Sequence, residues 1–131
     1  MSYSNPNRRS YVFPSVDYGA GDSSHSLRGP AGKTGTLVDI HLSATETFNS
    51  VTTDGYTQIG VSGGDLDAFA SFVQGDLAAT DAISAENGSD PDWLIDANIP
   101  ADTAVEVTCV APTGGTPTGI ATVTVVIDWA D

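Results

Sequence analysis

The chain has 131 residues, of which 40% are hydrophobic and only 16% are charged. This length predicts one domain with a buried core, and the composition excludes a disordered chain. Four Lys and Arg against 17 Asp and Glu give a formal net charge of -13. Such a charge argues against nucleic acid and against an anionic membrane surface as partners, because binding to either needs clustered cations.

The charge is distributed unevenly along the chain. All four cations lie in the first 33 residues, where only two acids are present, so this segment carries +2. From residue 34 to the end there are fifteen acids and no Lys or Arg, which gives -15. We interpret the chain as a basic arm followed by an acidic body, with the two presenting different surfaces.

Residues 1–35 are predicted to form an extended N-terminal arm. This segment is rich in Pro and Gly, and its apolar residues are isolated or aromatic, so it is not expected to fold alone. Spaced aromatics and cations suit a segment that docks into grooves on a partner; a disordered tail is the alternative. The candidate partner-binding residues are Arg8, Arg9, Tyr11, Phe13, Tyr18, Arg28 and Lys33.

Residues 36–131 are predicted to form an all-β domain. Residues 36–42 alternate, with Val38, Ile40 and Leu42 on one face, which is typical of a strand. Residues 46–53 and 56–61 read as a hairpin around the Asp54-Gly55 turn. Residues 65–75 fit either a strand or a helix, and the β-like surroundings favour a strand. Residues 76–92 are predicted to be a long loop with at most one helical turn.

The C-terminal part gives the clearest strand pattern. Residues 104–111 and 120–129 alternate between apolar and polar residues and are separated by a turn rich in Gly and Pro. The inward-facing residues are predicted to be Val105, Val107 and Cys109 on the first strand, and Val123, Val125, Ile127 and Trp129 on the second. Cys109 is then a small buried hydrophobic residue, not a nucleophile. Several short strands with turns between them predict a jelly-roll-like β-sandwich.

The residues give little support to catalysis, cofactor binding or metal binding. Only two histidines are present, His25 and His41, and each is more simply a solvated side chain than part of a triad or a zinc site. The GKT at residues 32–34 lacks the first glycine of a phosphate-binding loop, and a strand is expected to follow it. No stretch is long enough to span a bilayer, and no secretory signal precedes the domain. We therefore expect no enzyme activity, no cofactor, no nucleic acid and no membrane partner.

Two binding alternatives remain open at this point. The acid pairs Asp65-x-Asp67 and Asp90-x-Asp92, with Asp96, are of a kind that contributes oxygens to calcium loops, although no EF-hand loop is present. Trp93 and Trp129 are candidates for a sugar-stacking platform, with Trp129 also fitting the core.

Four segments resemble small structural proteins of tailed bacteriophages, the capsid decoration or cement proteins. They are residues 29–40 (GPAGKTGTLVDI), 101–108 (ADTAVEVT), 111–121 (APTGGTPTGIA) and 126–129 (VIDW). The resemblance covers most of residues 29–129, and residues 1–28 resemble no family.

The resemblance implies a β-sandwich on the outer surface of the virion, made in the host cytoplasm and carrying no catalytic residues. It implies that the major capsid protein is the partner and that the chain forms a homodimer or homotrimer at capsid symmetry axes. Such a protein stabilises an icosahedral capsid by bridging its subunits. The alternative function is a carbohydrate-binding β-sandwich module on a particle or cell surface.

Overall fold

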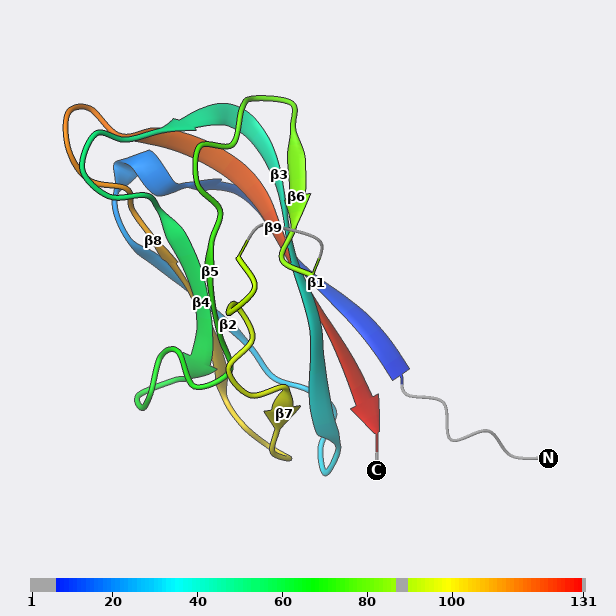
Figure 1. The fold of residues 1–131 in the computed structure, drawn as a ribbon. Helices are drawn as coiled ribbons and strands as arrows, with labels where there is room; N and C mark the ends of the chain where they lie inside the picture. The colour runs from blue at the N-terminus through cyan, green and yellow to red at the C-terminus, as the bar shows by residue number, and fades with distance from the viewer. Residues whose placement is uncertain (1–6, 87–89, 131) are drawn as a thin grey trace.

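The computed structural model describes residues 7–86 and 90–130 and confirms the predicted β-sandwich (Figure 1). The elements in chain order are β1 (Asn7–Asp17), the short 3-10 helix η1 (Tyr18–Ala20), β2 (Ser23–Leu27), β3 (Thr34–Asn49), β4 (Tyr56–Val61), β5 (Ala70–Val73), β6 (Ala82–Ser84), β7 (Asn98–Ile99), β8 (Val105–Val110) and β9 (Thr118–Ala130). No helix in these two ranges is long and apolar enough to cross a membrane.

The strands form two antiparallel sheets that pack face to face. One sheet has the order β1-β9-β3-β6, with β7 pairing with β3, and the other has the order β2-β8-β4-β5. Most connections pass from one sheet to the other. The first strand of each sheet, β1 or β2, is an edge strand, and β6 and β5 occupy the opposite edges.

The core lies between the sheets and follows the predicted alternation at the C-terminus. Every second residue of β9 from Gly119 to Trp129 is buried, and the residues between them are partly exposed. On β8, Val105, Val107 and Cys109 are fully buried. These strands belong to different sheets, so their inward faces meet across the core.

The prediction of a separate arm is wrong for the described part of residues 1–35. β1 pairs with β9 along most of its length, and β2 pairs with β8, so this segment supplies an edge strand to each sheet. Val16, Tyr18 and Leu27 are buried in the common core. The segment lacked a clear strand pattern because edge strands carry charges and proline, here Arg8, Arg9 and Pro14 on β1. Residues 1–6 of the predicted arm lie outside the described residues.

The predicted hairpin between residues 46–53 and 56–61 is also wrong. Residues 46–49 continue β3 and face β9, whereas β4 pairs with β8 and β5 in the other sheet. The connection around Asp54-Gly55 therefore crosses the end of the sandwich. Alternation identifies a strand but not the sheet to which it belongs, which is why the sequence could not distinguish these arrangements.

A β-bulge changes which residues of β3 face the core. Leu37 lies opposite Ile127 and Asp39 opposite Val126, so β3 has one residue more than β9 at this point. Leu37 is consequently buried, and Val38, predicted to share a face with Ile40 and Leu42, is only half-buried.

The central part of the chain follows the strand prediction. Residues 70–73 form β5 with Ala70 and Phe72 fully buried, as expected for a strand. Within the predicted loop 76–92, the described residues contain the short strand β6 instead of a helical turn.

Candidate functional site

The four cations of the chain gather at one end of the sandwich. In the sheet register, Arg8 lies opposite Asp128 and Arg9 opposite Ile127, near the end of β9. The loop from Arg28 to Lys33 reaches the same end. Gly29 lies so close to Trp129 that a Cβ on it would overlap the indole ring, and β3, which follows the loop, begins opposite Ala130. We call this group, Arg8, Arg9, Arg28 and Lys33, the cationic end; it lies beside the C-terminus in Figure 1.

Arg8 is held against the sandwich by Asp128. Its Nε and Nη2 donate to the two carboxylate oxygens of Asp128 at 2.7 and 2.9 Å. This hydrogen-bonded pairing raises the pKa of the Arg8 guanidinium and lowers the pKa of the Asp128 carboxyl. The Arg8 side chain remains 59% exposed, so the pair orients the guanidinium but adds little to stability.

The other three cations are placed differently. The Arg9 side chain is exposed and, among the described residues, forms no hydrogen bond or ion pair. Arg28 is exposed and donates from Nη1 to the carbonyl of Asp102 at 2.9 Å. The Asp102 carboxylate also accepts from the backbone N–H of Gly32 at 3.0 Å, which holds this loop in place. Lys33 is half-buried where the loop turns back, with its N–H bonded to the carbonyl of Pro30.

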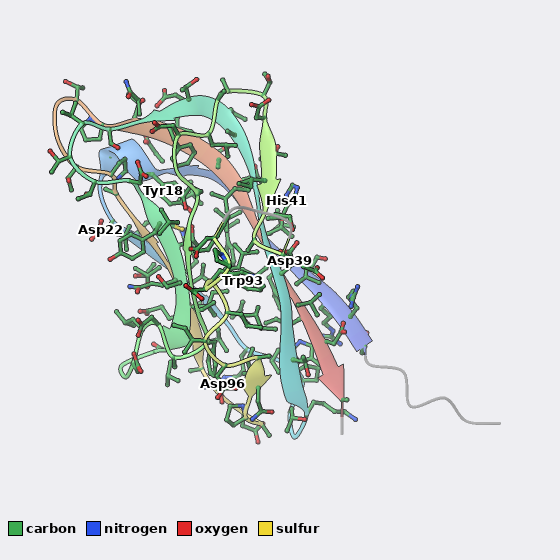
Figure 2. All side chains as sticks on the ribbon, viewed as in Figure 1. Tyr18, Asp22, Asp39, His41, Trp93 and Asp96 are labelled. Carbon is green, nitrogen blue, oxygen red and sulfur yellow. The ribbon has the colours of Figure 1, made fainter. Side chains whose placement is uncertain are left out.

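The predicted aromatic anchors are drawn into the sandwich. Tyr18 is fully buried (Figure 2), so it is not accessible to a partner and the assignment is wrong for this residue. Tyr11 and Phe13 are half-buried; the Tyr11 hydroxyl accepts from Trp129 Nε1 at 2.8 Å. The Phe13 ring lies 5.0 Å from the ring of His25, which joins the β1 edge to the β2 edge. Tyr11 and Phe13 can offer a partner only their outer parts.

Acidic side chains dominate the opposite end of the sandwich. Asp17 and Glu46 both lie opposite Ile120, far along β9 from Trp129. The connections that meet there contribute more exposed acids; the group comprises Asp17, Asp22, Glu46, Asp54, Asp76 and Asp81. Asp22 reaches the backbone N–H of Ala111 (2.8 Å) across this end (Figure 2). The acids at this end are not accompanied by any of the four cations, whereas the cationic end holds acids such as Asp102 and Asp128 among its cations. The sequence alternation could not predict this arrangement, because it depends on which loops meet at each end of the sandwich.

Asp39 and its hydroxyl partner lack the arrangement of a catalytic triad, and the cysteine is buried. His41 and Asp39 lie together on β3 (Figure 2), but the Asp39 carboxylate accepts directly from Ser84 Oγ at 2.6 Å and from the Glu86 N–H at 2.9 Å. A triad would need a histidine between the acid and the hydroxyl. Cys109 is buried, and burial raises the pKa of its thiol, which disfavours the reactive thiolate.

The acid pairs serve local structure. The Asp90 carboxylate accepts from the N–H groups of Val73 and Asp92, and Asp96 accepts from Asn98. Asp67 lies beside Asp65, and this neighbour raises the pKa of Asp67 through a shared hydrogen bond and like-charge repulsion. Within residues 7–86 and 90–130, no three His, Cys, Asp or Glu residues come together as a metal site would require.

The two tryptophans are buried, and the sugar-stacking platform considered for them is wrong. Trp93 is 8% exposed and points between the sheets (Figure 2), and Trp129 is 3% exposed. A stacking platform needs an open ring face, which neither residue presents.

The chain matches no family model and no curated protein. One similar solved structure is a chain of the cyanophage Pam1 capsid asymmetric unit. Its TM-score is 0.40 at 10% sequence identity, over 98% of this chain and 89% of that chain.

Proposed function

We propose that the chain is a virion structural protein that decorates the outer surface of an icosahedral phage capsid. In this role it bridges subunits of the major capsid protein and cements them together, as a binding protein and not an enzyme. The resemblance of residues 29–129 to phage decoration proteins supports this function. It is then made in the host cytoplasm and incorporated into the virion as a homodimer or homotrimer.

The observation that carries the proposal is the gathering of every Lys and Arg at one end of a rigid sandwich. A small protein that attaches to a larger surface needs one end that differs chemically from the rest. Here the cationic end contrasts with the exposed acids at the other end. The cationic end suits acidic groups on a shell, and the acidic end keeps the protein soluble before and after attachment.

The loop between β2 and β3 is the best-placed contact within this end. Arg28 and Lys33 lie on it, and the Asp102 bonds to Arg28 and Gly32 fix its shape before any partner binds. A preformed loop loses little conformational entropy on docking. Arg8 is already paired with Asp128, so it is a weaker candidate for an ion pair with the shell.

The test is binding of the purified chain to particles assembled from the major capsid protein of the same virus. We expect stoichiometric attachment that weakens as salt is raised, because added ions screen exposed charges. The double variant Arg28→Gln/Lys33→Gln should bind at least about tenfold more weakly, a loss of about 1.4 kcal/mol. The double variant Ala78→Glu/Thr116→Glu is the control, since it changes the net charge by the same two units at the acidic end.

The outcomes distinguish whether the chain attaches to the particles at all from whether it attaches through the cationic end. If the unmodified chain does not attach to the particles, the proposed function is wrong. If it attaches but both double variants bind equally well, the cationic end is not the contact. Circular dichroism of each variant establishes that the sandwich is folded.

The carbohydrate-binding alternative gains no specific support. Burial of Trp93 and Trp129 removes the aromatic platform on which it depended. Binding to a glycan array with no attachment to capsid particles would favour this alternative over the proposal.

A further inference from the structure

Three of the large hydrophobic side chains on the surface lie along one edge of the sandwich. Val73 on β5 is 43% exposed, and Leu94 and Ile95 are 40% and 55% exposed. The segment carrying Leu94 and Ile95 runs alongside β5, because Ser71 donates to the Trp93 carbonyl at 2.8 Å and Ile95 donates to the Phe69 carbonyl at 2.9 Å. Exposed apolar groups that cluster beside one strand mark an interaction surface better than scattered ones.

This apolar patch, defined as Val73, Leu94 and Ile95, is bordered by acids only. Asp65 and Asp67 precede β5, and Asp90, Asp92 and Asp96 lie on the neighbouring segment. The hydrogen bond to Asp65, together with the like charge of that neighbour, raises the pKa of Asp67. None of the four cations lies on β5 or on the segment from Asp90 to Asp96, so a partner that neutralises these acids must bring cations of its own.

The backbone along the patch is already occupied. The Ser71 and Ile95 bonds, and the Val73 N–H that donates to Asp90, use groups at the edge of β5. A partner therefore cannot add a strand to β5 itself at these positions, and we expect the contact to use side chains.

The β1 edge carries the complementary groups. Within five residues it presents the exposed Arg9, the half-buried rings of Tyr11 and Phe13, and Val12, which is 56% exposed. β1 and β2 form neighbouring edges, joined by the Phe13–His25 ring contact, whereas β5 is at the other edge of its sheet. The two complementary surfaces thus lie on opposite sides of the molecule.

We propose that copies of this chain associate head to tail, with the β1 edge of one copy, Arg9 to Phe13, docked on the acid-bordered apolar patch of the next. A symmetric contact of either surface with itself would oppose like charges, which favours the unlike pairing. Contacts between two different surfaces repeat from copy to copy and close into a ring when the rotation allows it.

This inference goes beyond the proposed function, because it concerns the chain in solution without any shell. It also leaves the loop of Arg28 and Lys33 at the cationic end outside the contact between copies. A ring formed by the edges can then present several such loops on one side.

The experiment is sedimentation velocity with light scattering on the purified full chain at micromolar to hundred-micromolar concentrations. We expect a particle whose mass is a multiple of 13.4 kDa and which dissociates as salt is raised. Arg9→Glu alters the β1 edge, and Ile95→Asp alters the patch. Each should raise the dissociation constant at least about tenfold, whereas Asp81→Arg at the acidic end should leave it unchanged.

Mixing the two altered chains tests the head-to-tail geometry directly. Arg9→Glu retains a working patch and Ile95→Asp retains a working β1 edge, so the mixture should form a 1:1 heterodimer and nothing larger. A monomeric unmodified chain throughout the concentration range would overturn the proposal, as would an oligomer that withstands Arg9→Glu. Neither result would bear on attachment to capsid particles, which is measured separately with the Arg28→Gln/Lys33→Gln variant.

Discussion

Tyr18 holds a short chain of buried polar groups inside the core. Its hydroxyl lies 2.6 Å from Thr57 Oγ1, which in turn donates to Gln74 Oε1 at 3.4 Å. Tyr18→Phe removes the shorter bond and should lower the free energy of unfolding by about 1–2 kcal/mol. Urea denaturation measures the change. Tyr56→Phe is the control, since the half-buried Tyr56 has no side-chain hydrogen bond to the described residues; equal losses in both variants would contradict this account.

Burial of Tyr18 also predicts how stability depends on alkaline pH. Desolvation raises the pKa of its hydroxyl well above the ordinary value of 10.0, and burial raises that of Cys109 above 9.0. The folded state therefore holds these protons more tightly than the unfolded state does. The associated stability is complete below about pH 9 and is lost progressively as the pH rises above the ordinary values. Urea midpoints between pH 7 and 11 should fall, and Tyr18→Phe should flatten the fall above pH 10; an unchanged slope would refute the assignment.

The ring of Trp129 fixes a glycine at the start of β3. A Cβ on Gly35 would lie 2.6 Å from Cζ3 of Trp129, and the ring cannot shift freely because its Nε1 donates to Tyr11. Gly35→Ala should therefore cost about 1–3 kcal/mol of unfolding free energy. Gly64→Ala is the control, because a Cβ there meets Val61 at an ordinary 3.5 Å. Guanidinium denaturation followed by tryptophan fluorescence compares the unfolding free energies of the two variants. Similar values would show that the Trp129 ring moves aside to accommodate the added Cβ.

At the scale of elements, β1 and β2 are parts of the sandwich and not an appendage. Deleting residues 1–28 removes an edge strand from each sheet together with the buried Tyr18 and Leu27. The truncated chain should lose its cooperative thermal transition, because β8 and β9 would each lose the strand paired with one of their edges. Circular dichroism and thermal melting test this. A truncated chain that melts cooperatively near the original temperature would restore the arm as an independent segment.

The elements differ in how far the sequence could predict them. β8 and β9 alternate over long runs, so their inward residues, from Val105 to Trp129, were predictable. β1 was missed because Arg9, Tyr11 and Phe13 alternate only briefly before Pro14 and the irregularity between Phe13 and Val16. Pairing partners were not predictable, since β3 and β4 are adjacent in sequence but lie in different sheets. A residue pattern with period two shows which face of a strand is buried, but the strand with which it pairs depends on contacts between residues far apart in the sequence.

At the scale of the whole molecule, the candidate site depends on which segments of the chain come together at one end of the sandwich. The division of charge at residue 33 was evident in the sequence, and the cations assigned from it lie together. Their gathering has a cause that the sequence did not show: β1 and the β2–β3 loop both reach the end of β9 at Trp129. The aromatic part of the site was less predictable, because an aromatic ring can fill a groove on a partner or pack in the core of its own chain. Tyr18 packs in the core.

The net charge of -13 should make the fold more stable in salt while the proposed contacts become weaker. Seventeen acids against four cations leave a net repulsion, and raising the ionic strength from about 0.01 to 0.15 M shortens the screening length from about 30 to 8 Å. The melting temperature should therefore rise by a few degrees over this range, since about 1 kcal/mol corresponds to roughly 4 °C in a domain of this size. Asp67→Asn/Asp92→Asn, which removes two of these charges, should reduce the rise. Calorimetry at a series of salt concentrations measures it, and a melting temperature that falls with salt would mean that attraction at pairs such as Arg8–Asp128 outweighs the repulsion.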